Sequence, residues 1–238
     1  MQRSWKGRDG VDNAGEEDQT RHEEEVEWAM KLLVFGARGR TGREIVAQGL
    51  DRGHVVTAFV RNPAALTTKH ERLKLAQGDV LDYPSVEAAV QGQDAVLSAL
   101  GVRKLRKNTI LSDGTKNLLR AMEQHGVKRF VCESSLGVGD SKGQLGWVFN
   151  LFIIPLFLRN IFRDKEVQEQ YIKQSNLDWI IVRPAVLTSG PRTGVYRSGF
   201  STTDRTIRGK VGRADVADFM LKQLTDDTYL RKTPGLSY

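Results

Sequence analysis

Short apolar runs and longer amphipathic stretches alternate along most of the chain. The runs have the length and apolar content of buried strands, and they occupy residues 31–35, 54–60, 73–77, 95–100, 129–133 and 179–182. The stretches between them carry helix signals, such as proline in a first turn or glycine after a last one, and cover residues 41–52, 84–90, 109–125 and 165–174. Such alternation predicts an α/β fold in which helices cover both faces of a doubly wound parallel sheet.

The first 29 residues break this pattern. They contain nine acidic and four basic residues, including three consecutive glutamates at positions 23–25, and they lack sustained apolar periodicity. We therefore predict a disordered acidic tail at residues 1–29. Residues 30–238 are expected to form a single domain, whose C-terminal part contributes the substrate pocket.

Charge differs between the tail and the domain. The whole chain has a formal net charge of +7, but outside residues 1–29 it holds 32 basic and 20 acidic residues. A basic domain can bind nucleic acid, an anionic membrane surface or small anionic ligands, and composition alone does not choose between them. Because the sequence has no recognition helix, zinc finger or RNA-binding signature, we expect a small-molecule substrate and no nucleic-acid partner.

Cysteine, histidine and hydropathy patterns narrow the class of protein further. Cys132 is the single cysteine, which excludes an intramolecular disulfide framework, and the four histidines lack metal-ligand spacing, so we expect no metal site. No apolar run reaches the roughly 20 residues of a membrane-spanning helix, and the N-terminal residues do not resemble a signal peptide. We expect a cytoplasmic protein without a transmembrane segment, present as a monomer or homodimer.

Three glycines follow the first apolar run and open the first predicted helix. Their spacing is G-x-x-G-x-x-G, and glycine is required where a chain turns tightly or its backbone approaches a phosphate. The helix N-terminus that follows offers unpaired N–H groups and positive potential to phosphates. An ordinary strand-to-helix turn without a ligand is the alternative interpretation. We favour a Rossmann-type dinucleotide site formed by Gly36, Ala37, Arg38, Gly39, Arg40, Thr41 and Gly42.

The end of the second predicted strand indicates which dinucleotide binds. NAD-selective sites commonly carry Asp or Glu there, whereas this strand is followed by Arg61. A guanidinium can pair bidentately with a 2′-phosphate, and Arg38 or Arg40 could add positive charge, although a solvated arginine is the alternative. We therefore predict NADP(H) as the cofactor.

Two further strand ends should border the predicted dinucleotide site. Asp79 and Val80 follow the third strand and are expected beside the adenine, although Asp79 could instead cap a turn. Leu100 and Gly101 follow the fourth strand and are expected along the pyrophosphate and the nicotinamide ribose.

These motifs together resemble a known family, the atypical short-chain dehydrogenases/reductases of the NmrA-like NAD(P)H-binding kind, and within it the biliverdin reductase B / flavin reductase type. The resemblance runs from about residue 31 to 238. Besides the glycine turn, it rests on Val60-Arg61-Asn62-Pro63, Gly78-Asp79-Val80, Gln93-Asp94-Ala95-Val96, His125-Gly126-Val127-Lys128, Cys132-Glu133-Ser134, the segment 177–184 and Ala214-Asp215-Val216-Ala217.

The resemblance implies either an NADPH-dependent reductase of flavins, quinones or biliverdin-like tetrapyrroles, or a non-catalytic NADP(H) sensor of the NmrA type. By position, Ser134 would lie beside the nicotinamide and the substrate as a hydrogen-bond donor, with Ser135 as a substitute. Pro184 and Val186 would border the nicotinamide, and Lys165 would contact the ribose or an anionic substrate.

One departure from the wider superfamily bears on the chemistry. Its usual Tyr-x-x-x-Lys pair is represented by Lys165, but Ile161 stands in the tyrosine position. A simple ketone needs a proton as hydride arrives, whereas a flavin, quinone or linear tetrapyrrole can delocalise the added charge. The sequence therefore predicts a conjugated acceptor or a loss of catalysis, with Tyr171 as an alternative proton source if its helix turns it inward.

The apolar segment 147–158 is too short and too interrupted by proline for a membrane span. We expect it to form a wall of the substrate pocket or a partner surface, with a core helix pair as the alternative.

Overall fold

The computed structural model describes residues 29–102, 108–144, 152, 156, 158–200, 204 and 207–238. The predicted acidic tail lies outside these residues except for its last position. Residues 103–107, which carry four basic side chains, and most of the apolar segment 147–158 also lie outside them.

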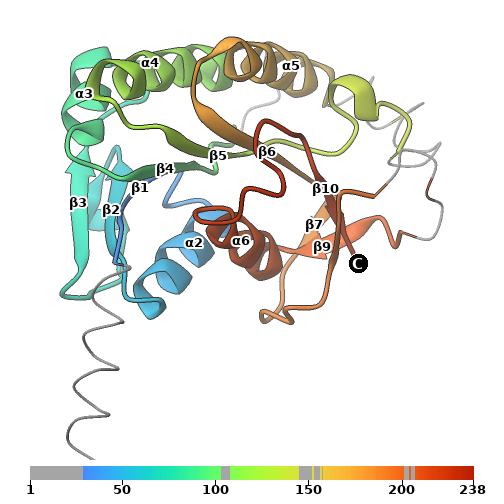
Figure 1. Cartoon of the computed structure of the whole chain (residues 1–238), viewed down its shortest axis with the longest axis horizontal. Coiled ribbons are helices and arrows are strands. Elements are labelled where there is room, and N and C mark those ends of the chain that lie inside the picture. The colour runs from blue at the N-terminus through green and yellow to red at the C-terminus, as the bar shows by residue number, and fades with distance from the viewer. Residues whose placement is uncertain are drawn as a thin grey trace, which may run out of the picture.

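One large sheet forms the centre of the molecule (Figure 1). Its first six strands are parallel and lie in the spatial order β3-β2-β1-β4-β5-β6, the order typical of dinucleotide-binding Rossmann domains. They are β1 (Lys31–Phe35), β2 (Val55–Val60), β3 (Leu73–Gln77), β4 (Ala95–Ser98), β5 (Arg129–Glu133) and β6 (Asp178–Pro184).

Four shorter strands extend this core beyond β6. Strand β10 (Gly235–Ser237) pairs in parallel with β6, and β8 (Arg197–Ser198) pairs antiparallel with β10. A separate parallel pair joins β7 (Val186–Thr188) to β9 (Lys210–Gly212). These strands fix the part of the chain that follows the carboxyl end of β6.

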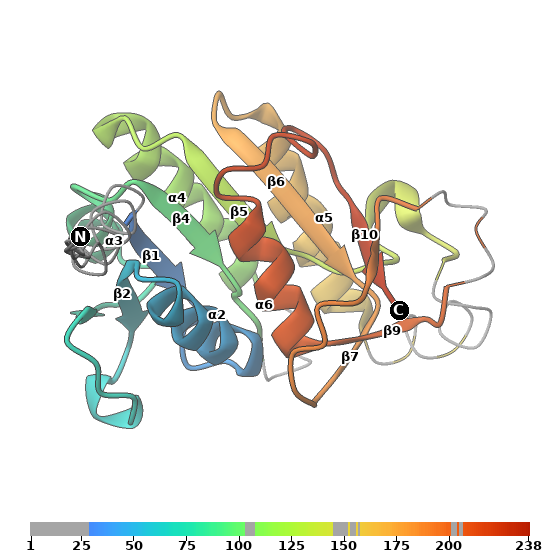
Figure 2. The same ribbon diagram turned by 60° about the horizontal axis from the view of Figure 1, so that its bottom comes forward.

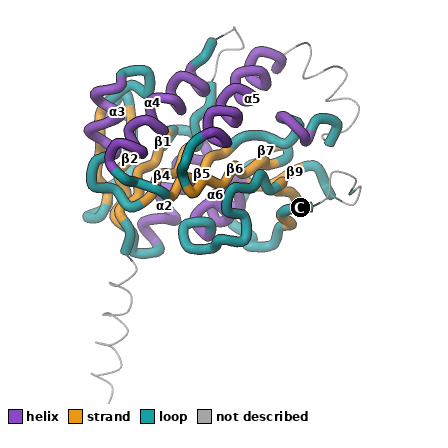
Figure 3. Tube along the Cα trace, turned by 45° about the horizontal axis from the view of Figure 1, so that its top comes forward, coloured by secondary structure: helices purple, strands orange, loops and turns teal. Residues whose placement is uncertain are grey.

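Helices cover both faces of the sheet (Figures 1 and 3). One face carries α3 (Tyr83–Val90), α4 (Ile110–His125) and α5 (Arg159–Gln174), which pack side by side. The other carries α2 (Arg40–Asp51) and α6 (Arg213–Lys222), which pack on each other. The sheet therefore lies between two helical layers, as the alternating pattern predicts.

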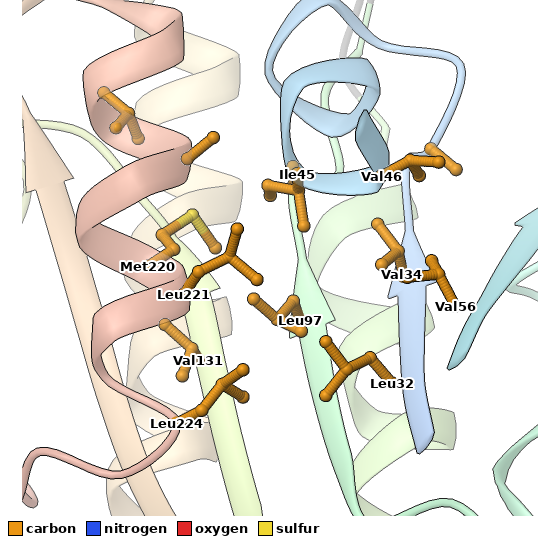
Figure 4. Packing of buried hydrophobic residues seen from close by; sticks show 14 of the residues in the cluster. Leu32, Val34, Ile45, Val46, Val56, Leu97, Val131, Met220, Leu221 and Leu224 are labelled. Atoms are coloured by element: carbon orange, nitrogen blue, oxygen red, sulfur yellow. The ribbon is translucent and has the colours of Figure 1, made fainter. Parts of the chain in front are cut away.

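Alternation along the central strands builds two separate hydrophobic clusters. In β1, Leu32 and Val34 pack toward α2 and α6, while Leu33 and Phe35 pack toward the opposite helices. Figure 4 shows the α2 and α6 side, where Ile45 and Leu221 meet the strands. Burying each such side chain stabilises the fold by about 1.5–3 kcal/mol.

The N-terminal end of α4 is capped from another helix. The carboxylate of Asp164, in α5, accepts the backbone N–H groups of Leu111 and Ser112 at 3.0 and 3.2 Å, and it also accepts the Ser112 hydroxyl. These N–H groups lack partners within α4, so the docking of α5 stabilises the first turn of α4.

The predicted fold class, a single Rossmann-type α/β domain, is confirmed, but several boundaries were wrong. β4 ends at Ser98 rather than residue 100, β2 begins after His54, and α5 begins at Arg159 rather than at residue 165. The sequence pattern also missed α6 and the strands β7 to β10. These strands are only two or three residues long, and α6 buries two aspartates that obscure its helical periodicity.

Candidate dinucleotide and acceptor site

The carboxyl ends of β1 and β4 form the point where the strand order reverses, and ligands of open parallel sheets bind outside such a point. The chain passes from β1 through the glycine turn into α2, and β4 lies on the other side of β1 (Figure 2). Each predicted site residue follows a strand that ends at this edge or lies close to such a strand end.

At two glycines of the turn, the backbone packs so closely that a side chain has no room. Gly36 has a φ of +74°, and a Cβ atom there would lie 2.3 Å from the carbonyl oxygen of Ala99. A Cβ atom at Gly42 would lie 2.2 Å from the carbonyl oxygen of Gly36. The turn is closed by a 2.7 Å hydrogen bond from the Gly39 N–H to that same oxygen. Gly36 and Gly42 are therefore required by the backbone itself.

The start of α2 is suited to bind an anion. Gly39 is the N-cap residue and provides no side-chain cap, and the first turn contains no acidic residue. Ala37 and Thr41 are buried, while Arg38 and Arg40 are exposed beside them. Unpaired N–H groups, positive dipole potential and two nearby cations all favour phosphate here. These residues fit the pyrophosphate of a dinucleotide.

Arg61 follows β2 directly and its side chain is exposed. The next residue, Asn62, accepts the N–H of Ala64 at 3.1 Å and starts a short 3-10 turn. The guanidinium therefore lies at the strand end where the adenosine ribose is expected in this fold.

The loop after β3 is fixed by its own hydrogen bonds and by α4. Asp79 accepts the N–H of Leu81 at 3.0 Å, so it does cap a turn. Val80 is buried against Gly114, where a Cβ atom would lie 2.6 Å from it, and its carbonyl accepts Asn117 Nδ2 at 3.0 Å. The two predicted adenine-side residues are thus held rigidly.

The predicted nicotinamide side is built by the ends of β4, β5 and β6. Leu100 is half-buried and Gly101 is exposed after β4. Pro184 is the buried last residue of β6, and Val186 opens β7 with 38% of its surface exposed. The N–H of Leu136 donates to the Pro184 carbonyl at 2.9 Å, which ties the loop after Ser134 to this segment.

Ser134 belongs to a buried polar chain that the sequence did not reveal. Its hydroxyl donates to Glu169 at 2.7 Å, and Glu169 in turn accepts two hydrogen bonds from Arg183, at 2.6 and 3.0 Å. A third bond joins Arg183 to Asp140 at 2.6 Å. The proton of Ser134 is therefore directed at a carboxylate, so its oxygen is left as a hydrogen-bond acceptor rather than the donor that the sequence predicts. The one feature of the sequence that could have indicated these buried hydrogen bonds is a charged residue, Arg183, inside an apolar strand.

Lys165 points toward the same strand end. Its Nζ donates to the main-chain carbonyl of Glu133 at 3.4 Å, so the lysine turns inward from α5. Ile161 lies one helical turn earlier, where the wider superfamily has tyrosine. Tyr171 packs partly buried against the hydrophobic cluster under α4 and α5. Among the described residues, no hydrogen bond links it to Ser134 or Lys165.

Two neighbouring residues of β5 have strongly altered acidity. Burial raises the pKa of the Cys132 thiol to about 12, so this thiol stays neutral and packs as a small apolar group. Burial also raises the pKa of Glu133, against the opposing charge of Lys165, a hydrogen bond from Thr41 and the charge of Arg213. The sequence assigned Glu133 no role beyond its place in the motif Cys132-Glu133-Ser134.

A cavity of about 490 Å³ lies between the loop after β5 and the start of α5. Lys142 pairs with Glu166 across it at 2.6 Å, whereas Arg159 and Arg163 form no ion pair with a described residue. The cavity therefore has net positive charge. Its lining residues are Gly137, Lys142, Gly143, Arg159, Phe162, Arg163 and Glu166.

A comparison with protein families agrees with this geometry. The model of the NAD(P)H-binding family matches residues 36–227, from the first glycine of the turn to the loop after α6. The chain belongs to this family. Its predicted resemblance is thereby confirmed at the level of the NAD(P)H-binding fold and an oxidoreductase-type domain.

Two curated relatives of this NAD(P)H-binding chain are similar over most of its length. An uncharacterized chloroplastic protein of Arabidopsis thaliana is 34% identical over 211 residues, which are 83% of this chain and 72% of that protein. The photosystem II assembly factor Ycf39 of Synechocystis is 29% identical over 215 residues, 86% of this chain and 61% of that factor. The chain thus spans less than two thirds of Ycf39.

Among solved structures, the anaerobillin reductase ChuY of Escherichia coli O157:H7 superimposes with a TM-score of 0.73. The match covers 87% of this chain and 96% of that one at 24% identity, so it supports the fold. In the part of the chain that the structure describes, no helix is both long and apolar enough to cross a membrane.

Proposed function

We propose that this chain is an NADPH-dependent oxidoreductase that transfers hydride to a conjugated acceptor. The observation that carries the proposal is the convergence of Ser134 and Lys165 at the end of β5, in a domain whose glycine turn would accept a pyrophosphate. When bound, the dinucleotide would supply the hydride. The family membership supports a nicotinamide cofactor of some kind.

Arg61 supports NADPH over NADH as that cofactor. It occupies the strand end where an acid would select NAD, and it is exposed and able to pair with a 2′-phosphate. Arg38, in the turn, adds positive charge on the same edge. Asp79, Val80, Leu100 and Gly101 would border the adenine and the ribose.

Ser134 and Lys165 would position the reacting groups rather than exchange a proton with a ketone. With its own proton held by Glu169, Ser134 would accept a hydrogen bond from the carboxamide of the nicotinamide. Lys165 would hold the ribose or an acidic group of the acceptor. Because Ile161 cannot donate a proton, an acceptor that delocalises charge is favoured.

The positively charged cavity supports an acceptor that is flat and acidic. Phe162 offers an apolar surface, and Arg159 and Arg163 offer cations to carboxylates or phosphates. Flavin mononucleotide and biliverdin combine conjugation with such groups. A neutral quinone would use the apolar surface alone.

A non-catalytic NADP(H) sensor is the second candidate, and Ile161 is the observation that favours it. The sensor would bind the dinucleotide tightly and reduce nothing.

For either function, we propose the cytoplasm as the location of the protein, as the sequence predicts. The relative from Arabidopsis thaliana is described as chloroplastic.

The test measures loss of NADPH absorbance with flavin mononucleotide, a benzoquinone and biliverdin, with NADH in parallel. We expect turnover with NADPH and at least one acceptor, slowed about 10-fold or more by Ser134→Ala because a positioning hydrogen bond is lost. Ser175→Ala, on the far end of α5, is the control and should leave the rate unchanged. Tight NADPH binding with no oxidation by any acceptor would favour the sensor.

A further inference from the structure

Glu133 places a carboxylate where the sheet is otherwise apolar. It is the last residue of β5, and Val131 two positions earlier packs in the cluster between the sheet, α2 and α6. Alternation puts Glu133 on that same face. Only 8% of its surface is exposed. An ionised carboxylate at this depth is costly unless positive groups or donors surround it.

The groups around Glu133 come from three helices. The Thr41 hydroxyl donates to its Oε1 at 3.2 Å from the first turn of α2. Lys165, from α5, donates to the main-chain carbonyl of Glu133 at 3.4 Å, and its positive charge favours the ionised carboxylate. Arg213, the first residue of α6, adds positive charge from the third side, although burial and then repulsion by Arg40 lower its own pKa. On its own strand the neighbouring titratable side chain is the neutral Cys132.

These surroundings are also those of the proposed cofactor phosphates. Thr41 belongs to the glycine turn, and the uncapped N-terminus of α2 is the place proposed for the pyrophosphate. A bound dinucleotide would therefore bring two negative charges close to Glu133. A like charge nearby opposes ionisation of a carboxyl group.

We infer that Glu133 couples dinucleotide binding to proton uptake, because the cofactor binds best when this carboxyl is neutral. The inference rests on the cofactor site proposed above. Burial already raises the pKa of Glu133 in the free protein, and arriving phosphates would raise it further. Binding at a pH between these two pKa values draws a proton onto the protein.

The affinity for the dinucleotide should fall as the pH rises. Below both pKa values Glu133 is neutral in the free and bound protein, and affinity is at its maximum. Between them, each rise of one pH unit weakens binding up to tenfold because a proton must be taken up. Above both, affinity is low and constant again.

Calorimetric titration in buffers of different ionisation enthalpy measures the protons taken up on binding. NADH is the cleaner probe, since the 2′-phosphate of NADPH itself titrates near pH 6. The wild-type protein should take up as much as one proton per dinucleotide between pH 5 and pH 8. Glu133→Gln should take up none and bind with nearly constant affinity. Glu44→Gln, elsewhere on α2, is the matched control and should behave as wild type.

A second variant tests the inference even if Glu133→Gln does not fold. Thr41→Val removes the hydroxyl that stabilises the ionised carboxylate, so the loss of affinity should move to higher pH, while Thr41→Ser should not move it. Equal proton uptake in Glu133→Gln and wild type would overturn the inference and leave the cofactor site standing. If wild type binds neither NADPH nor NADH at any pH, both the proposed cofactor site and this inference are wrong.

Discussion

Arg61 is the residue on which cofactor choice is expected to depend. Replacing it with alanine should lower kcat/KM for NADPH about 10- to 100-fold and leave NADH nearly unchanged, because charged hydrogen bonds contribute about 1.5–3 kcal/mol. Steady-state kinetics with both dinucleotides measures the ratio. Arg43→Ala, an exposed arginine one turn into α2, is the control. An equal loss with both dinucleotides would contradict a role in 2′-phosphate recognition.

Glu169 is hydrogen-bonded to both Ser134 and Arg183. Glu169→Gln leaves the buried guanidinium of Arg183 without its main carboxylate, so the free energy of unfolding should fall by about 3 kcal/mol. Urea denaturation followed by circular dichroism measures this change. Lys173→Met removes only a partly exposed 3.5 Å pair to the same carboxylate and should cost at most about 1 kcal/mol. Similar losses in the two variants would show that the pair with Arg183 adds little.

At the scale of elements, the glycine turn sets the position of α2. Gly42→Ala would place a methyl group 2.2 Å from the Gly36 carbonyl, whereas at Gly39 the same oxygen lies 3.0 Å away. Gly42→Ala should therefore shift the helix start and raise the Kd for NADPH at least about 10-fold. Gly39→Ala should have a smaller effect. Fluorescence titration of NADPH gives both constants, and the reverse order would argue against this packing.

The elements that sequence could predict are those with a strong local signal. Leu32 to Phe35 is an unbroken apolar run, and the glycines after it mark the turn whatever the rest of the chain does. Glu133 could not be assigned a role, because its partner Thr41 is 92 residues away. Glu169 lies in a helix and Arg183 in a strand, and the sequence pattern of neither element indicates that the two side chains pair. The strand ends that border the proposed site were thus predictable, and the buried polar links beside them were not.

For the whole molecule, Asp218 links three segments in one buried contact. Its carboxylate accepts a hydrogen bond at 2.7 Å from Arg52, the residue that follows α2. It also pairs with Lys222 at 2.8 Å and accepts the Tyr196 hydroxyl at 2.6 Å. Burial opposes its ionisation, but the hydrogen bonds from Lys222 and Tyr196 outweigh this and hold the pKa of Asp218 below its ordinary value. Asp215 on the same helix has a lowered pKa for similar reasons.

This arrangement predicts the response of the fold to acid. Because the folded pKa of Asp218 lies below the unfolded value of about 3.9, its contribution to stability is complete above pH 5 and is lost as pH falls through the folded value. Unfolding free energies from pH 7 to pH 2 should therefore decline less steeply in Asp218→Asn than in wild type. The exposed Asp113→Asn is the control. Parallel curves for wild type and Asp218→Asn would contradict the prediction.

The pairing of α2 with α6 also has a consequence for the chain as it is synthesised. Gln48 of α2 donates to the carbonyl of Ala214 at the start of α6, a contact that spans 166 residues. A ribosome adding about 5–20 residues per second needs roughly 8 to 33 seconds to make the intervening chain. Throughout that interval Ile45, Leu50 and their neighbours have no α6 to cover them. We expect the nascent chain to present an apolar face that chaperones can bind before the domain can close.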